Sequence, residues 1–241
     1  MGLSAAVACA REGARLVVCG RDDEWADAAT AALGDEVPCV RGDATDPALA
    51  ARVVADAVAR HGRVDGVFHV AGGSGRRFGD GALHDVTDDG WQQTLALNLT
   101  TTFNTTRAAV QYFLSAGHGG SIVTMTSVLA YAPSPRHFAT HAYAAAKAGI
   151  IGLTRSSAAY YAPHDIRVNA IAPALVDTPM ARRAVGDRSI DEYIRHKQPL
   201  DGGRVVRADD VDGAVVYLLS RESRMVTGQV LAVDGGWCVS A

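Results

Sequence analysis

The sequence lacks the features that mark several large classes of protein. Its 241 residues contain no apolar run long enough to cross a bilayer, and the net charge of −3 predicts no surface for nucleic acid. The eight histidines form no HExxH motif, so no metal site is expected. No signal peptide is recognisable, and the four cysteines have no CxxC spacing, which together indicate reduced thiols in a cytoplasmic protein.

The chain also lacks the usual beginning of an α/β nucleotide-binding fold. Such folds start with a strand, continue through a glycine-rich loop and then enter a helix. Here the opening, MGLSAAVACAREGARLVVCGRD, has the pattern of a helix followed by a buried strand at 14–19. The strand and the loop that normally precede such a helix are absent from the printed sequence.

Apolar runs and amphipathic segments alternate along the rest of the chain. Predicted strands lie at 14–19, 37–41, 64–70, 121–127, 166–172 and 228–234. Predicted helices lie at 23–33, 46–61, 88–115, 141–161 and 209–220. In the second of these helices, Asp46-Pro47 marks the start and Gly62 marks the end. The alternation predicts an α/β fold, with a Rossmann-like doubly wound parallel sheet between two helical layers in one domain over 1–241.

Two stretches interrupt this alternation. A polar stretch at 177–205 is a candidate substrate-binding lid, because long irregular segments in compact domains usually bind something; a disordered loop is the alternative. The stretch AGGSGRRFGDG at 71–81 is rich in glycine and follows a strand. It lacks G-x-G-x-x-G spacing and no helix begins inside it, so it is not predicted to cradle phosphate.

The pair Tyr143 and Lys147 in HAYAAAKAG is the strongest local signal for chemistry. The four-residue spacing places both side chains on one face of the predicted helix. A tyrosine hydroxyl has a pKa near ~10, and an ammonium ~4 Å away favours its phenolate by about 4 kcal/mol at an effective dielectric of ~20. That attraction lowers the pKa by up to roughly three units, so Tyr143 is expected to exchange protons near neutral pH.

Two polar residues upstream belong with this pair. Ser127 ends a predicted strand, at the edge where parallel sheets bind ligands, and its hydroxyl is able to donate to a substrate oxygen. Asn98 lies within an apolar predicted helix, where asparagine is intrinsically unfavourable. It is either a buried amide with satisfied hydrogen bonds or a member of the same site.

Together these residues resemble the short-chain dehydrogenase/reductase family, and the resemblance runs nearly end to end. Tyr143 and Lys147 match the family's Tyr-x-x-x-Lys, and Ser127 and Asn98 match its other two catalytic members. The resemblance implies hydride transfer between a nicotinamide C4 and a carbinol or carbonyl carbon. Two further segments match the family's nicotinamide-contacting segment and its closing strand, NAIAPALVDTPM at 169–180 and VTGQVLAVDGG at 226–236.

The resemblance also implies a role for each catalytic residue. Tyr143 is the general acid in reduction and the general base in oxidation, and Lys147 lowers its pKa and binds the nicotinamide ribose. Ser127 polarises the carbonyl, and Asn98 holds a water that links Lys147 to solvent. Cofactor contacts are implied at Gly2, Arg21, Asp43, Ala44, Ala71, Gly72, Tyr143, Lys147, Pro173, Val176 and Thr178.

The choice between NADP(H) and NAD(H) depends on the residues after the predicted strand 14–19. Gly20 stands where an NAD-selective acid is expected, and Arg21 follows it. A guanidinium holds a 2′-phosphate bidentately, so the sequence favours NADP(H). NAD(H) remains the alternative because Asp22 and Asp23 come next.

The sequence departs from the family pattern most strongly at its beginning. Met1-Gly2 aligns with the end of the family's Thr-Gly-x-x-x-Gly-x-Gly loop, so the fold is expected to lack the first strand and most of this loop. Without that strand the sheet has a gap with unpaired backbone groups. We therefore expect that roughly 15–20 native residues precede Met1. Elsewhere, His69-Val70-Ala71-Gly72 replaces Asn-Asn-Ala-Gly, and Pro173-Ala174 replaces Pro-Gly.

By the same resemblance, the substrate pocket is bordered by 71–81, 128–142 and 177–205. The second of these is a few residues longer than usual for the family. Arg76 and Arg77 in the first stretch either meet an anionic substrate or are surface charges. His137, Phe138 and His141 in the second stretch either touch substrate or belong to a plain surface loop.

The predicted function is an NADP(H)-dependent oxidoreductase that interconverts a secondary alcohol and a ketone. The alternative is a non-catalytic relative that keeps the fold as a binding or regulatory protein and has lost tight cofactor binding. The four matched catalytic residues favour the enzyme, and the missing loop favours the alternative. The family also implies a homodimer or homotetramer paired through the predicted helices at 88–115 and 141–161.

Overall fold

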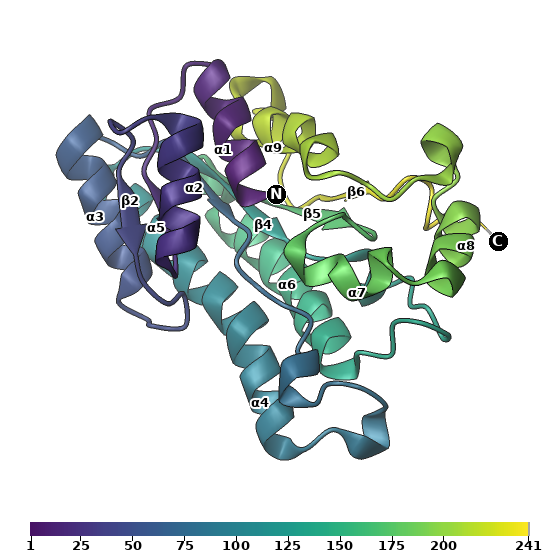
Figure 1. Ribbon diagram of the computed structural model, residues 1–241. Coiled ribbons are helices and arrows are strands. Elements are labelled where there is room, and N and C mark those ends of the chain that lie inside the picture. Colours follow the sequence, from purple (N-terminus) through teal and green to yellow (C-terminus); the bar gives the residue numbers. More distant parts are fainter. Residues whose placement is uncertain (241) are drawn as a thin grey trace.

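The structure of the chain is a computed structural model, and it describes residues 1–240. Its strands are β1 (Val18–Gly20), β2 (Cys39–Arg41), β3 (Gly66–His69), β4 (Gly120–Met125), β5 (Ile166–Pro173) and β6 (Val230–Val233). Its helices are α1 (Gly2–Arg11), α2 (Asp23–Leu33), α3 (Leu49–His61), α4 (Asp88–Leu95), α5 (Thr101–Ala116), α6 (His141–Tyr161), α7 (Arg182–Val185), α8 (Arg188–Lys197) and α9 (Asp212–Leu219). Figure 1 shows α3 and α8 at opposite sides of the molecule.

All paired strands run parallel, as the alternating pattern predicts. β3, β4, β5 and β6 are hydrogen-bonded neighbours in that order, and Ile122 of β4 pairs with Val67 on one side and Val168 on the other. β1 pairs separately with β2. Among residues 1–240 no ladder joins β1 to β3, so the sheet is in two pieces and the expected gap is present.

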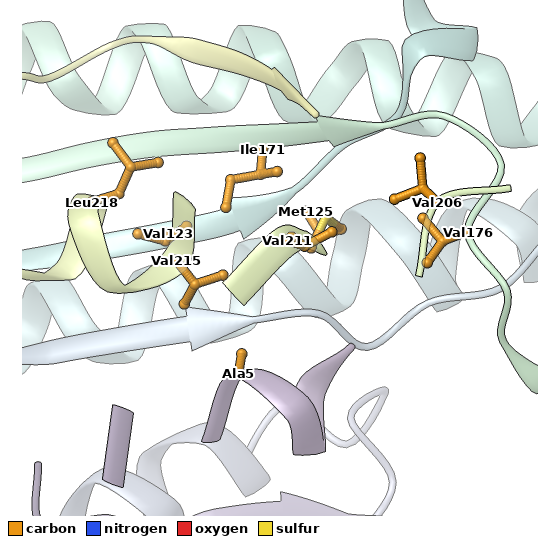
Figure 2. Packing of buried hydrophobic residues seen from close by; sticks show 9 residues of the cluster. All are labelled: Ala5, Val123, Met125, Ile171, Val176, Val206, Val211, Val215 and Leu218. Carbon is orange, nitrogen blue, oxygen red and sulfur yellow. The ribbon is translucent and has the colours of Figure 1, made fainter. Parts of the chain in front are cut away.

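Helices cover both faces of the larger sheet, which gives the predicted three layers. Neighbouring residues of β4 point to opposite faces, as the period of a strand requires. Val123 faces α1 and α9, where Ala5, Val215 and other buried residues meet (Figure 2). Ile122 faces α5 and α6, in a second core that includes Phe113. Each buried valine, isoleucine or phenylalanine of these cores contributes about 1.5–3 kcal/mol to the stability of the fold.

Several predicted boundaries are wrong by a few residues. Asp46 does not start a helix; its carboxylate accepts from the Ala48 N–H at 2.9 Å in a turn, and α3 begins at Leu49. Gly62 ends α3 in the left-handed conformation, as predicted. The strand predicted at 14–19 is confined to the three residues that pair with β2, and the helix predicted from 209 is a 3₁₀ turn until α9 begins.

The prediction of an irregular stretch at 177–205 is also wrong, because α7 and α8 lie within it. Asp187 caps α8 by accepting from the Ser189 N–H at 2.9 Å and the Ile190 N–H at 3.3 Å. Ile190 and Ile194 are buried one turn apart, so a short amphipathic helix packs on the domain. Among residues 1–240 we find no helix with the length and apolar character needed to span a bilayer.

Candidate active site

Tyr143 and Lys147 lie one turn apart on α6, and both line a pocket at the carboxyl ends of β4 and β5. Ser127, which follows β4, lines the same pocket. The Ser127 hydroxyl accepts from the Leu129 N–H at 3.2 Å and is close enough to Tyr143 to lower the pKa of its phenol. The structure therefore brings together Ser127 and Tyr143, predicted to act on one substrate oxygen, and Lys147, predicted to support the tyrosine.

Lys147 is buried, with 4% of its side chain exposed. Its Nζ donates to the carbonyl oxygen of Met125 at 2.8 Å, the one hydrogen bond that this ammonium makes within residues 1–240. An ammonium has three donors, so two are left for a ligand. Burial lowers the pKa of Lys147 to about 8, which leaves the group charged at neutral pH but with a proton that is easily given up.

The prediction that the pKa of Tyr143 falls to near neutrality is wrong in this structure. Burial raises the pKa of Tyr143 to about 12, and the nearby Ser127 hydroxyl offsets only part of that rise. The Nζ of Lys147 lies 5.5 Å from the centre of the tyrosine ring and donates to Met125 instead of the phenol oxygen. Loss of hydration thus outweighs the attraction calculated for a pair at contact distance.

Asn98 lies beside Lys147, in a π-helical turn between α4 and α5 (Ala96–Thr100). Its side-chain amide accepts from the Gly73 N–H at 3.1 Å and donates to the Gly73 and Thr94 carbonyls, both at 2.9 Å. A Cβ at Gly72 would lie 2.7 Å from Asn98 Oδ1 and 3.4 Å from Lys147 Nζ. Glycine is therefore required at 72, and Asn98 fixes the backbone that passes next to the lysine.

His69 ends β3 directly under this backbone, where the family pattern has an amide. Its ring nitrogens are hydrogen-bonded to the hydroxyls of Thr101 (3.3 Å) and Thr105 (2.9 Å) on α5. Burial, with the charge of Lys147 as a second cause, lowers the pKa of His69 to about 3. The imidazole is therefore neutral at physiological pH, and two hydroxyls satisfy it in place of the missing amide contacts.

Sequence reasoning missed Asp80, which holds the start of α6. Thr140 precedes this helix and makes no side-chain cap of its own. The buried carboxylate of Asp80 accepts from the Ala142 N–H at 3.0 Å and from the Tyr143 N–H at 2.9 Å. Asp80 thus satisfies two backbone donors at the helix end that carries Tyr143. A conventional cap precedes its helix in sequence, and this one lies 62 positions away from Ala142.

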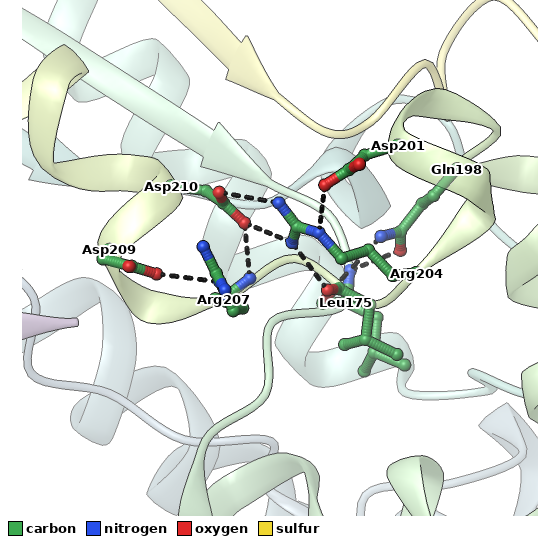
Figure 3. A network of polar contacts seen from close by, with 8 residues as sticks. Leu175, Gln198, Asp201, Arg204, Arg207, Asp209 and Asp210 are labelled. Atoms are coloured by element: carbon green, nitrogen blue, oxygen red, sulfur yellow. Dashed lines mark hydrogen bonds and ion pairs between the residues drawn. The ribbon is translucent and has the colours of Figure 1, made fainter.

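A second missed residue, Gln198, holds the pocket wall that follows β5. Its buried amide accepts from the Leu175 N–H at 3.0 Å and donates back to the Leu175 carbonyl at 3.4 Å. Nearby, Arg204 bonds both oxygens of Asp210 and one of Asp201 (Figure 3). This network ties the segment after β5 to the chain that returns from α8.

The predicted cofactor contacts fall into two groups. Gly72, Pro173, Val176, Thr178, Tyr143 and Lys147 line the pocket, and Gly2 and Ala71 are next to the lining residues Met1, Val70 and Gly72. Arg21, Asp43 and Ala44 follow β1 and β2, outside the pocket.

The residues around the ends of β1 and β2 suit the adenosine half of a nicotinamide nucleotide. A Cβ at Gly20 would lie 2.0 Å from the Trp25 ring, so packing leaves no room there for an acidic side chain. Arg21 is exposed, and its long ion pair with Asp22, at 4.0 Å, leaves the guanidinium able to contact a ligand phosphate. Asp43 is kept ionised by hydrogen bonds from Thr45, which lower its pKa. With the two free donors of Lys147 at the other end, the chain fits such a cofactor.

Comparisons with known proteins agree with this geometry. A family model described as enoyl-(acyl carrier protein) reductase matches residues 1–238. Momilactone A synthase of Oryza sativa subsp. japonica is 36% identical over 232 residues, which are 95% of this chain and 82% of that protein.

Solved structures resemble the whole chain. A short-chain type dehydrogenase/reductase from Mycobacterium ulcerans superposes with a TM-score of 0.86 at 29% identity, covering 99% of this chain and 85% of the other. A gluconate 5-dehydrogenase from Burkholderia cenocepacia J2315, in complex with NADP and tartrate, superposes with a TM-score of 0.87 at 27% identity. That match covers 99% of this chain and 91% of the other.

Proposed function

Because this chain belongs to the short-chain dehydrogenase/reductase family and is an NAD(P)-dependent oxidoreductase acting on CH–OH groups, we propose that it transfers a hydride between NADP(H) and a secondary alcohol or ketone. One observation carries the proposal. Tyr143 and Ser127 line one pocket together with the buried ammonium of Lys147, which keeps two donors free. This arrangement can hold a carbonyl oxygen and deliver a proton to it.

In the proposed mechanism, Tyr143 moves the proton and Ser127 holds the oxygen. A nicotinamide nucleotide, when bound, supplies or accepts the hydride. In reduction, the carbonyl carbon gains the hydride and the carbonyl oxygen takes the hydroxyl proton of Tyr143. Ser127 donates a hydrogen bond to the same oxygen and polarises it. In oxidation, Tyr143 takes the alcohol proton while the carbinol carbon loses the hydride.

Lys147 and Asn98 support this proton transfer in different ways. With a pKa raised to about 12, Tyr143 is in its acid form at neutral pH, which suits reduction. The charge of Lys147 stabilises the phenolate left after transfer, and its free donors bind the nicotinamide ribose. Asn98 is a positioning residue for the Gly72–Gly73 backbone. In this proposal it also keeps the relay water that links Lys147 to solvent.

The preference for NADP(H) rests on Arg21. A guanidinium forms bidentate bonds with a 2′-phosphate, and the packing of Trp25 against Gly20 excludes the acid that would select NAD(H). Replacement of Arg21 by alanine is expected to raise the Kd for NADPH by about tenfold and to leave the Kd for NADH unchanged. Equal effects on both nucleotides would contradict the assignment.

The function is tested by cofactor binding and turnover together. NADPH is expected to raise the melting temperature of the 241-residue chain, and a panel of ketones should then show NADPH oxidation by absorbance. Tyr143→Phe should abolish oxidation while the melting shift persists, because only the phenolic proton is lost. A chain that neither binds NADPH nor oxidises it with any ketone would support the non-catalytic alternative.

We also propose that the protein works as a homodimer or homotetramer in a reducing compartment such as the cytoplasm. Phe103 on α5 and Tyr160 on α6 are exposed, and both helices present apolar surface to a second copy. Cys9, Cys19 and Cys39 are free thiols, as is Cys238. Light scattering at several protein concentrations gives the subunit number.

A further inference from the structure

Two arginines line the pocket from different parts of the chain. Arg76 belongs to a 3₁₀ turn after β3 (Arg76–Phe78), and Arg183 belongs to α7. Neither forms an ion pair with any acid among residues 1–240. Other arginines near α8 are paired: Arg188 with Glu192, Arg195 with Asp191 and Arg204 with Asp210.

The acid nearest to Arg76 in sequence is already committed elsewhere. Asp80 uses both carboxylate oxygens to accept backbone N–H groups at the start of α6. The Arg76 side chain makes one hydrogen bond, a long one of 3.4 Å to the carbonyl oxygen of His137. Burial lowers the pKa of Arg76, the positive charge of Arg183 lowers it further, and the negative charge of Asp80 raises it in part. The two guanidinium groups therefore repel each other, and neither forms an ion pair with a carboxylate among residues 1–240.

The rest of the pocket around these arginines is apolar and aromatic. Leu129, Met180, Phe138 and Trp237 line it, and the rings of Phe138 and Trp237 are 6.0 Å apart in an edge contact. An apolar wall with two cations that form no ion pair matches a ligand that has an apolar body and one anionic end. The like-charge repulsion between the arginines is relieved when that anionic end binds.

We propose that Arg76 and Arg183 form a subsite for a carboxylate group of the substrate, so that the oxidoreductase acts on anionic ketones or hydroxy acids with an apolar body. This inference rests on the proposed function, since it places the reacting carbonyl at Tyr143 and the carboxylate at the arginines. Both guanidinium groups present paired donors that match a carboxylate.

A phosphate of the cofactor is the competing anion for these arginines. Arg76 contacts the loop of His137, whose ring lies 5.1 Å from the ring of Tyr193 on α8. The residues suited to the adenosine end, Arg21 and Asp43, follow β1 and β2 instead. The arginine pair therefore belongs to the wall built by α7, α8 and the loop before α6, which is the substrate side of the pocket.

The test measures binding and does not depend on turnover. Calorimetric titration of the cofactor-free and NADP⁺-saturated chain with 5-oxohexanoate and 5-oxohexanamide compares an acid with its neutral match. A longer pair, 7-oxooctanoate and 7-oxooctanamide, covers a wider spacing. The variants are Arg76→Gln with Arg183→Gln, and the matched control Arg77→Gln with Arg182→Gln. The control removes the same charge from the same two elements, at positions outside the pocket lining.

The expected result is that the acid of at least one pair binds wild type about tenfold or more tightly than its amide. The ratio should fall to within about twofold in the Arg76/Arg183 double variant and persist in the control. Equal binding of acid and amide to wild type at both lengths overturns the inference. So does an acid preference that survives loss of Arg76 and Arg183, or one that the control variant also abolishes.

Affinity for NADPH separates the two anions. It should be unchanged in the Arg76/Arg183 variant, and a loss of NADPH affinity with an intact acid preference would assign the arginines to the cofactor. If the proposed function fails while the subsite stands, acids bind in an arginine-dependent way but no NADPH is oxidised. Turnover of neutral ketones without an acid preference would leave the function standing and remove only the subsite.

Discussion

The carboxylate of Asp80 accepts a hydrogen bond from the backbone N–H of Tyr143 at 2.9 Å, although the two residues are 63 positions apart. The contact joins the loop after β3 to the first turn of α6. By holding this turn, the contact fixes where the tyrosine hydroxyl lies in the pocket beside Ser127. The position of the proposed proton donor therefore depends on a residue that has no proposed chemical role of its own.

Replacement of Asp80 by alanine is expected to lower kcat by about tenfold, because α6 loses the acceptor that fixes its first turn. Two buried N–H groups would be left without partners, which costs about 1–2 kcal/mol of unfolding free energy. Asp80→Asn keeps one acceptor oxygen and should recover part of both losses. Urea unfolding and steady-state kinetics measure the two effects.

The exposed Asp85 in the same loop gives a matched control. Asp85→Asn should leave kcat and stability unchanged. An Asp80→Ala variant with lower stability but wild-type kcat would show that the cap supports only the fold.

Replacement of Lys147 by methionine is expected to stop turnover, with a fall of about a hundredfold or more, while it raises stability at pH 7. Burial lowers the pKa of Lys147 from 10.5 to about 8, so the folded state carries a penalty for the charge at any pH below 8. This penalty lowers the free energy of unfolding of wild type by roughly 3 kcal/mol. The variant escapes the penalty but loses the hydrogen bond to Met125, which costs it about 1 kcal/mol.

The pH dependence gives the sign of this effect. Between about pH 8 and 10.5 the unfolded chain binds a proton on Lys147 that the folded chain does not, so wild-type stability rises with pH. The Lys147→Met variant has no such rise. The difference between the two proteins in urea unfolding should therefore shrink across this interval, and a constant difference would refute the assignment.

His69 is expected to make the fold sensitive to acid. Its pKa is about 3 in the folded protein against an ordinary 6.5, so the unfolded chain binds the extra proton between these values. Through His69 alone, the free energy of unfolding should then fall by about 1.4 kcal/mol for each pH unit below 6.5. His69→Asn should flatten that slope between pH 6.5 and 5, as measured by urea unfolding.

Asparagine at position 69 also changes packing, so His69→Asn is expected to lose some stability equally at all pH values. This uniform loss does not affect the slope with pH. The exposed His84 supplies the comparison, and His84→Asn should keep the wild-type slope. A wild-type slope in His69→Asn would show that other groups cause the acid sensitivity.

Replacement of Gln198 by alanine is expected to raise the KM for the ketone and for NADPH, because the wall segment at Leu175 loses both of its side-chain anchors. The Leu175 N–H would be buried without an acceptor, which costs about 1–3 kcal/mol of stability. His196→Ala, an exposed change in the last turn of α8 just before Gln198, is the control. Unchanged KM values in Gln198→Ala would show that the backbone bonds between this wall and Val206 are enough to hold it.

The sequence predicted the parts of the site that depend on local spacing. The four-residue spacing places Tyr143 and Lys147 on one face of α6 wherever the helix begins. Ser127 follows a strand, and ligands bind at the edge of a parallel sheet where the strands end. Asp80 and Gln198 were not predictable in the same way. Their partners are backbone groups far along the chain, and backbone groups leave no pattern in a sequence.

Two other expectations failed for identifiable physical reasons. The pKa of Tyr143 was predicted from charge alone, and the loss of hydration on burial has the larger effect. The polar composition of 177–205 suggested a loop, although Asp187 followed by Ile190 and Ile194 is a cap and an amphipathic spacing. That signal was present in the sequence, but the charged residues around it favoured the interpretation of the segment as a loop.

The turn that begins at Gly75 carries Arg76 at one end and leads directly to Asp80. It is a closed unit, because the N–H groups of Phe78 and Asp80 both donate to the Gly75 carbonyl, at 2.8 and 3.2 Å. Under the proposals above, one short loop thus contributes both to the choice of substrate and to the placement of the proton donor. A lineage that altered this loop to accept a new substrate would also disturb its own catalyst, so specificity in this protein should evolve more readily through α7.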